Sequence, residues 1–239
     1  MSESLDAQMW ERLLAETKNR SIIDFLNANS IAVTLLSEGD FFAQRYTSQG
    51  WALPEKYYSI PANSYQPAVA TLEESIYYHG YWINCHWYLN VRDSIVSDLC
   101  FPEPDEYNRH LCLAMEKGIS IGVHVRRGDF VSLGWTTATS FYHEAVTRMK
   151  SVFEQAHFFV FSDEPQWCRE HAQELGFSPE DTVSFPDQNT GAKSFWDMYH
   201  MTRCSHLIIS NSSFSYLAAL LNQSPNKLVI TPTEHRLVV

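Results

Sequence analysis

The sequence has few cysteines, and their spacing fits neither a metal site nor a disulfide framework. Five cysteines occur in 239 residues, so their number is odd, and no Cys-X-X-Cys pair is present. This pattern argues against a zinc ribbon and favours reduced thiols in a cytosolic protein. No apolar run reaches the roughly 18 residues of a membrane span, and the acidic N-terminus lacks the apolar segment of a signal peptide. We therefore expect a cytoplasmic protein, with a peripheral position at the inner face of the membrane as the alternative.

Positive charge is also scarce. Lys and Arg total 17 against 28 Asp and Glu, which gives a net charge of −11. A nucleic acid is therefore excluded as the expected partner, because phosphate binding along a strand needs a broad basic surface. A small anionic ligand is still compatible, since it needs only one local cluster of positive charge. The G-X-S-X-G and H-E-X-X-H signatures are absent too, which argues against a serine hydrolase or a zinc protease.

What the sequence does contain, from residue 119 onward, is a regular alternation of strands and helices. Ile119, Ile121, Val123 and Val125 alternate with smaller or polar residues, which is typical of a strand. We expect further strands at 157–161, 182–185, 206–209 and 227–230. We expect helices at 139–155, 165–175, 194–203 and 213–222. This order predicts an α/β fold in which helices cover both faces of a parallel sheet.

The first half of the chain is less regular. Apolar spacing predicts a helix over 5–27 and a short strand over 31–36. Residues 39–66 carry prolines and many tyrosines and are expected to be irregular, and helices are expected over 86–99 and 105–117. We therefore expect two domains: a reduced, mostly helical N-terminal domain at 1–117 and a Rossmann-like domain at 118–239.

The first polar cluster closes the first regular strand, at His124-Val125-Arg126-Arg127-Gly128-Asp129. Adjacent strand residues point to opposite faces, so one arginine is expected to face a ligand and the other to pack behind it. The arginine side chain has a fork of donors that suits diphosphate oxygens. Gly128 lets the chain turn, and Asp129 is expected to pair with Arg127. The alternative is a surface turn held by a salt bridge.

Three further polar groups follow later strands or open helices. Ser162 and Asp163 leave the second strand, and the alternative role for either is to cap the next helix. The segment 210–215, Ser-Asn-Ser-Ser-Phe-Ser, opens a helix whose free N–H groups suit a phosphate, with simple capping as the alternative. Asp197 opens another helix, where a carboxylate can accept hydrogen bonds from a guanine edge or merely favour the first helical turn.

The sequence resembles the α-1,2-fucosyltransferase family, glycosyltransferase family eleven, in three segments that occur in the family's order. They are HVRRGDF (124–130), FSDEPQW (161–167) and the stretch 196–232, which contains NSSFS. The resemblance covers about residues 75–232. It implies a GT-B fold and transfer of L-fucose, with inversion and without a metal, from GDP-β-L-fucose to the 2-hydroxyl of a β-galactoside. GDP-fucose is then a co-substrate, and no cofactor is expected.

The resemblance also implies roles for individual residues. Arg126 is the expected β-phosphate ligand, and Asp129 is its candidate catalytic partner because it is the carboxylate nearest to the arginines. His124 and Asp197 are the expected guanosine contacts. The residues expected to bind GDP-fucose are His124, Arg126, Arg127, Ser162, Asp163, Asp197, Asn211, Ser212, Ser213 and Phe214.

Two features depart from the family pattern. The glycine-rich GLGNQ segment of the family is absent, and its paired tryptophans after SFS are Tyr216 and Leu217 here. These departures keep open a shortened relative that binds GDP-fucose or GDP with weak or no transfer. A third alternative is an unrelated nucleotide-binding α/β protein, which would not prefer GDP over ADP or UDP.

Overall fold

The computed structural model describes residues 46–47, 50–51, 57–59, 65, 67, 77–79, 86–89 and 91–232. Contacts divide the chain into two units. One is Met1–Trp82 with Ser97–Cys100, and the other is Ile83–Val96 with Phe101–Val239. The helix expected over 5–27 and the strand expected over 31–36 lie outside the described residues, and the domain boundary at residue 117 stays a prediction.

The first unit contains two short strand pairs. Strands β1 (Tyr46–Thr47) and β2 (Gly50–Trp51) pair antiparallel, and β3 (Tyr57–Ser59) pairs parallel with β4 (Tyr77–His79). The expectation that 39–66 is irregular throughout is therefore wrong, because aromatic residues favour strands wherever a partner strand is available.

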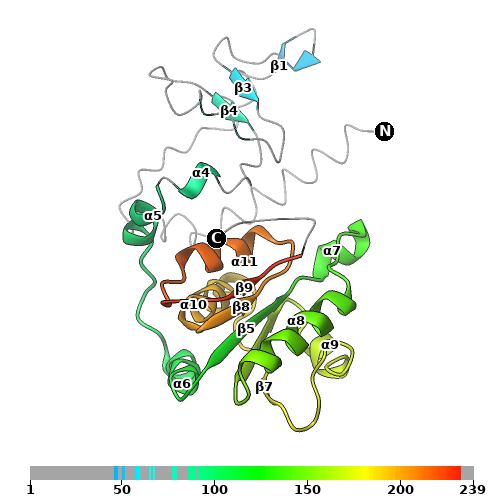
Figure 1. The fold of residues 1–239 in the computed structure, drawn as a ribbon. Coiled ribbons are helices and arrows are strands. Elements are labelled where there is room, and N and C mark those ends of the chain that lie inside the picture. Colours follow the sequence, from blue (N-terminus) through cyan, green and yellow to red (C-terminus); the bar gives the residue numbers. More distant parts are fainter. Residues whose placement is uncertain are drawn as a thin grey trace. The chain divides into compact units, whose positions relative to one another are not determined.

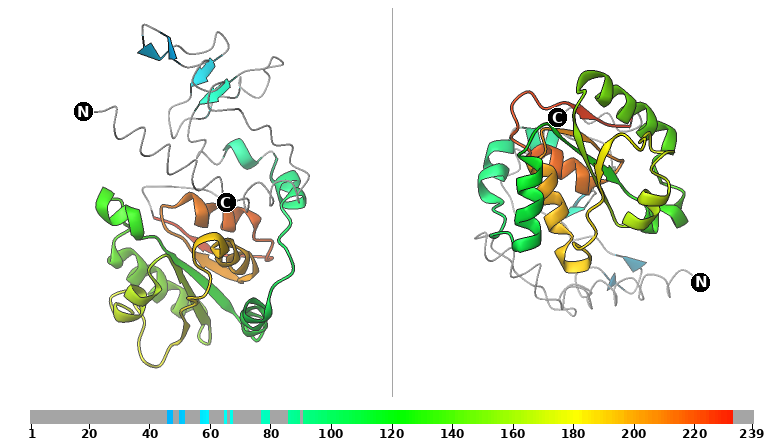
Figure 2. Two further views of the ribbon diagram at one scale, coloured as in Figure 1. Left: turned by 180° about the vertical axis from the view of Figure 1, so that it is seen from behind. Right: turned by 90° about the horizontal axis from the view of Figure 1, so that it is seen from below.

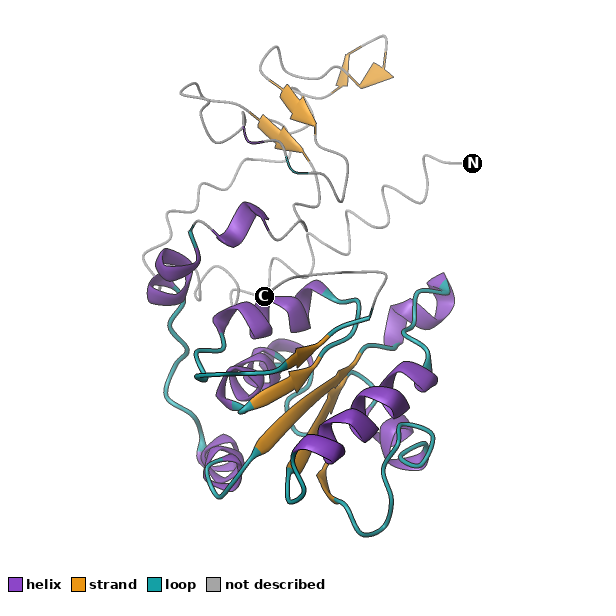
Figure 3. Cartoon of the chain, in the orientation of Figure 1, coloured by secondary structure: helices purple, strands orange, loops and turns teal. Residues whose placement is uncertain are grey.

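The second unit is built on a five-stranded sheet in which every pair is parallel. Its spatial order is β7-β6-β5-β8-β9. The strands are β5 (Ser120–Val125), β6 (His157–Ser162), β7 (Thr182–Ser184), β8 (His206–Ile208) and β9 (Val229–Ile230). Each expected strand from residue 119 onward is present, and the parallel α/β architecture is confirmed (Figures 1 and 3).

Helices cover both faces of this sheet (Figure 2). On one face, α8 (Thr139–Val152) and α9 (Pro165–Glu170) pack against Ile121, Val123 and Phe158. On the other face, α6 (Glu106–Met115), α10 (Phe195–Arg203) and α11 (Ser213–Leu221) pack against Phe159, Phe161 and Leu207. Helix α6 therefore belongs to the core of the sheet, although its residues were expected to lie in the N-terminal domain.

Strand β5 shows what the alternation in the sequence encodes. Every residue of the strand is buried, so the alternation does not separate a core face from a solvent face. Ile121, Val123 and Val125 face α8 and α9. Gly122 faces α10, where a Cβ atom would lie 2.9 Å from Leu207 Cδ2 and 3.0 Å from Cys204 Sγ. The small residue lets the end of α10 lie close to the sheet.

Several helix boundaries differ from the expectation. The helix expected over 86–99 is two helices, α4 (His86–Leu89) and α5 (Arg92–Asp98), and α8 and α9 end three and five residues early. Helix α7 (Gly128–Leu133) was not expected. None of the helices in the described part of the chain is both long and apolar enough to span a bilayer.

The C-terminal end of α10 is closed by a buried side chain from beyond α11. The side-chain amide of Asn222, which is fully buried, donates to the carbonyls of Met201 (3.0 Å) and Cys204 (2.7 Å). Its oxygen accepts the N–H of Ser224 at 2.8 Å. Asn222 therefore satisfies carbonyls that the end of a helix leaves without partners.

We predict that Asn222→Ala lowers the free energy of unfolding by about 2–4 kcal/mol, because it removes three hydrogen bonds at a buried position. The measurement is urea unfolding followed by circular dichroism. The matched control is Gln223→Ala, an exposed neighbour, which should change stability by less than about 0.5 kcal/mol. Equal stabilities for the two variants would contradict this role.

Candidate functional site

Most of the candidate residues lie where the order of the strands reverses, at β5. Strand β6 follows β5 along the chain and lies on one side of it, whereas β8 lies on the other side. In open parallel sheets, ligands bind beyond the carboxyl ends of the strands at such a switch point. The segments after Val125, Ser162 and Ile208 leave this edge and hold most of the candidate residues (Figure 1).

Arg126 stands at this edge between two carboxylates. Its Nη2 lies 2.6 Å from Asp129 Oδ1, and its Nη1 lies 2.9 Å from Asp163 Oδ2. The guanidinium carbon is 5.3 Å from the centre of the Phe130 ring, and about a third of the side chain is exposed. The expectation that Asp129 pairs with Arg127 is wrong, because α7 turns Asp129 back onto Arg126 within three residues.

Arg127 contacts a different pair of residues, Glu164 and Trp167. Its Nε lies 2.9 Å from Glu164 Oε2, and its guanidinium carbon lies 3.5 Å from the centre of the Trp167 ring in α9. A guanidinium over an indole face is a favourable cation–π contact. Both arginines lie beyond the end of β5 and contact consecutive carboxylates, Asp163 and Glu164, so their opposite projection from one strand stays a prediction.

Asp163 joins the end of β6 to the turn after β5. Its Oδ2 bonds to Arg126, and its Oδ1 accepts the backbone N–H of Arg127 at 2.9 Å. Gly128 has φ +28°, and a Cβ atom there would lie 2.5 Å from Asp163 Oδ2. Asp163 therefore does not cap the helix that follows it. Ser162 Oγ instead accepts the N–H of Glu164 at 3.0 Å, in the turn before α9.

His124 forms a neutral wall of the site. It is buried, its Nδ1 lies 2.9 Å from Ser210 Oγ, and its ring stacks on Phe214 with 5.2 Å between ring centres. Burial, with a smaller effect from the charge of Arg126, lowers the pKa of His124 to about 3. The imidazole is therefore uncharged at neutral pH, so it offers hydrogen bonding and a flat surface to a ligand but no charge.

The start of α11 lies beside His124. Ser212 caps the helix by accepting the N–H of Phe214 at 3.3 Å, and Ser213 is the first helical residue. Asn211 is held by the segment after α7, since its Nδ2 donates to the Trp135 carbonyl (2.6 Å) and its Oδ1 accepts from Thr137 (3.1 Å). The positive end of a nine-residue helix therefore lies at the carboxyl edge of the sheet, where it suits an anion.

Asp197 belongs to a separate group. It is buried in the first turn of α10, and its Oδ1 accepts from Asn189 Nδ2 at 3.0 Å. Burial raises the pKa of Asp197 to about 7, although the bond from Asn189 lowers it. Among the described residues, no hydrogen bond joins Asp197 to the arginine group. Asp197 and His124 nevertheless lie on the same sheet face, where the ring of His200 stacks at 6.3 Å on Phe161, the register partner of His124.

The sequence therefore identified most of the residues at this edge but missed several of their partners. Arg127 is held by Glu164, and Asn211 is held by Trp135 and Thr137. A local sequence pattern cannot predict these contacts, because each partner is more than 30 positions away. Within the described residues, no three His, Cys, Asp or Glu side chains gather in a way that could hold a metal ion.

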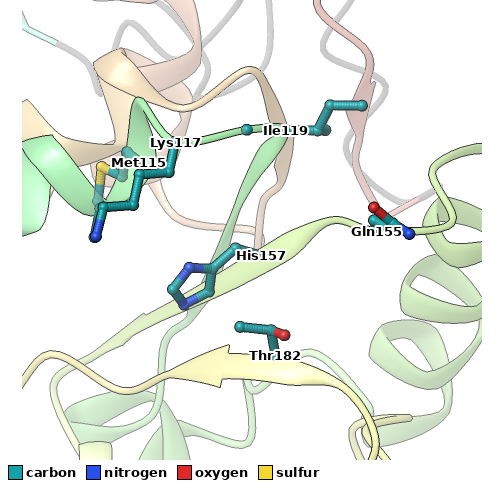
Figure 4. A pocket seen from close by; sticks show the side chains of 8 residues that line it. Met115, Lys117, Ile119, Gln155, His157 and Thr182 are labelled. Carbon is teal, nitrogen blue, oxygen red and sulfur yellow. The ribbon is translucent and has the colours of Figure 1, made fainter.

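A hollow of about 220 Å³ lies at the opposite edge of the sheet. Figure 4 shows Lys117, Ile119, His157 and Thr182 around it, all close to the starts of β5, β6 and β7. His157 is tied there to Ser184 Oγ at 2.8 Å. None of the candidate residues lines this hollow, and parallel sheets bind their ligands at the other edge. The candidate site is therefore the carboxyl edge.

The fold and the polar edge define a parallel α/β domain with polar and charged side chains gathered at the carboxyl edge of its sheet. A model of glycosyl transferase family 11 matches residues 33–236, so the chain belongs to this family. An alpha-1,2-colitosyltransferase of Escherichia coli is 29% identical over 169 residues, which cover 68% of this chain and 57% of the relative. A galactoside alpha-(1,2)-fucosyltransferase 2 of Gorilla gorilla gorilla is 26% identical over 190 residues, 74% of this chain and 51% of the relative. The chain spans about half the length of these curated relatives.

We predict that Gly128→Ala destabilises the turn, because the added Cβ would meet Asp163 and the backbone angle is unfavourable for alanine. The expected loss in the free energy of unfolding is about 1–3 kcal/mol, in the range found for strained backbone positions. Urea unfolding measures it. The matched control is Gly118→Ala, since a Cβ at Gly118 meets nothing within 4 Å. The role of Asp163 in shaping this turn is refuted if both variants are as stable as the parent.

Proposed function

We propose that the carboxyl edge of the sheet binds GDP-fucose and that the protein transfers L-fucose from it to the 2-hydroxyl of a β-galactoside. The observation that carries the proposal is the joint placement of Arg126 and the start of α11 at the switch point of the sheet. Membership of glycosyl transferase family 11 and the galactoside alpha-(1,2)-fucosyltransferase activity named for one relative support this reaction, and the alpha-1,2-colitosyltransferase activity named for another supports the same linkage.

The contacts suggest how the donor is held. A diphosphate takes hydrogen bonds from the Arg126 guanidinium and from the first N–H groups of α11, around Ser212 and Ser213. The uncharged ring of His124, stacked on Phe214, lies beside the sugar of the nucleoside. Asp197 receives the edge of the guanine base. Arg127, which is anchored on Trp167, acts by holding the turn from behind.

The proposed reaction is a displacement with inversion. The acceptor oxygen forms a bond to the anomeric carbon of fucose while the bond from that carbon to the β-phosphate oxygen breaks. The bonding electrons leave with GDP, where Arg126 and the α11 N-terminus stabilise the added charge. Asp129, which is exposed and next to Arg126, takes the proton of the acceptor hydroxyl. A GT-B fold for the protein is part of this proposal.

We predict that Arg126→Ala weakens GDP binding, because it removes a charge-assisted contact with the diphosphate. The loss should be about 2–3 kcal/mol of binding free energy, measured by calorimetric titration. Arg127→Ala is the matched comparison: it should lower thermal stability and leave GDP affinity within about threefold, since its side chain contacts Glu164 and Trp167. Unchanged GDP affinity in Arg126→Ala would overturn the assignment of the site.

We also predict that transfer survives chelation. Arginine and a helix N-terminus supply the positive charge for the leaving diphosphate in the proposed site. GDP release from GDP-fucose and lactose should therefore proceed at the same rate with and without EDTA. Loss of activity in EDTA that Mn²⁺ alone restores would contradict the proposal. GDP binding without acceptor-dependent GDP release would instead identify a nucleotide-binding relative.

A further inference from the structure

Four buried polar side chains form a network at the start of α10. They come from three segments: α6 supplies Asn108, the loop after β7 supplies Asn189, and α10 supplies Asp197 and His200. Asn108 and His200 are fully buried, and Asn189 and Asp197 are 6% and 7% exposed. Burying so many polar groups is costly unless each is hydrogen-bonded, so the network calls for an explanation.

The direction of each bond in the network can be assigned. The Asn108 amide nitrogen donates to Asp105 Oδ1 at 2.7 Å, so its oxygen must be the atom that faces His200 and Asn189. That oxygen only accepts, hence His200 donates to it from Nε2 (2.8 Å) and Asn189 donates from Nδ2 (3.0 Å). Burial lowers the pKa of His200 to about 4, so the ring is neutral.

The second hydrogen of the Asn189 amide goes to Asp197. Nδ2 of Asn189 lies 3.0 Å from Asp197 Oδ1, so both amide hydrogens are used, one on α6 and one on α10. Among the described residues, this is the one hydrogen bond to the Asp197 carboxylate. It fixes one oxygen of a nearly buried carboxylate and leaves Oδ2 for another donor.

The topology places the first turn of α10, which carries Asp197, at the carboxyl edge of the sheet. Chain direction reverses between β7 and β8, so α10 runs against the strands and begins at their carboxyl edge. Helices α10 and α11 pack together on the same sheet face. Asp197 lies in the first turn of α10, one turn before His200, whose ring lies over Phe161 beside the strand that carries His124.

We propose that Asn189 is a positioning residue for base recognition: it holds Asp197 Oδ1 so that Oδ2 meets the ring N–H and amino group of guanine. This inference rests on the proposed function, in which a guanine nucleotide occupies the edge. Adenine lacks a donor pair in this arrangement, so the network selects the base while Arg126 and α11 hold the diphosphate.

The positioning has a consequence for pH. Asp197 must be ionised to accept two donors from guanine, and its pKa lies at about 7 because burial outweighs the bond from Asn189. GDP binding should therefore strengthen as pH rises through 7. The other titratable or charged groups that face the network are Asp105 at the N-cap of α6, Tyr107 and Cys112 of α6, Asp187 of the loop, Lys193 just before α10, and His200 and Arg203 of α10. Of these, His200 shares the Asn108 oxygen with Asn189.

The test compares the full-length parent with Asn189→Ala by calorimetric titration of GDP and ADP between pH 5.5 and 9. Removal of a hydrogen bond to the carboxylate should raise the midpoint of the GDP profile by about one pH unit, which is roughly fivefold weaker binding at pH 7. ADP binding, already weaker, should not change. The matched control is Gln188→Ala, an exposed neighbour in the same loop, whose profile should follow the parent.

The outcomes separate the two proposals. If the parent does not bind GDP, the proposed function fails and this inference fails with it. If the parent binds GDP and the profiles of Asn189→Ala and the parent coincide, only the positioning role of Asn189 is overturned. Should Asn189→Ala not fold, Asn189→Asp keeps the size of the side chain and replaces the donor with an acceptor. Its midpoint should rise further, and an unshifted midpoint would overturn the inference.

Discussion

The Asp163 carboxylate is the interaction on which the edge of the sheet depends. One oxygen neutralises the Arg126 guanidinium, and the other accepts the N–H of Arg127, so a single side chain ties the end of β6 to the turn after β5. The backbone at Gly128 must pass so close to this carboxylate that no side chain fits there. The start of α7 and the ion pair between Arg126 and Asp129 lie next to this contact.

The sheet could be predicted from the sequence because its strands are short apolar runs separated by helical ones. The alternation in β5 identified a strand but suggested a simpler reason for the pattern than the structure shows. Its odd positions fill one core, whereas Gly122 and His124 serve the other face, where a helix end and a polar site replace ordinary packing. Two buried faces with different tasks produce the same period as one buried and one exposed face.

Helix α7 and the network around Asp197 could not be predicted in this way. The N-terminal N–H of the α7 turn is satisfied by Asp163, which lies 36 positions further along the chain, so no capping signal stands next to the helix. Asn108, Asn189 and His200 read as ordinary polar residues in sequence. They form a network because the fold brings α6, a loop and α10 together. Tertiary hydrogen bonds of this kind produce no periodic pattern in the sequence.

The pairing of Arg126 with two carboxylates makes ligand binding an exchange rather than an addition. Before a diphosphate arrives, the arginine charge is already balanced by Asp129 and Asp163. In the proposed site, an incoming phosphate competes with these carboxylates for the guanidinium charge. The net Coulomb gain is then smaller than for a bare arginine, and added salt weakens both partners in the exchange alike. In the proposed site, shape and base recognition therefore add to the selectivity that the phosphate contact supplies.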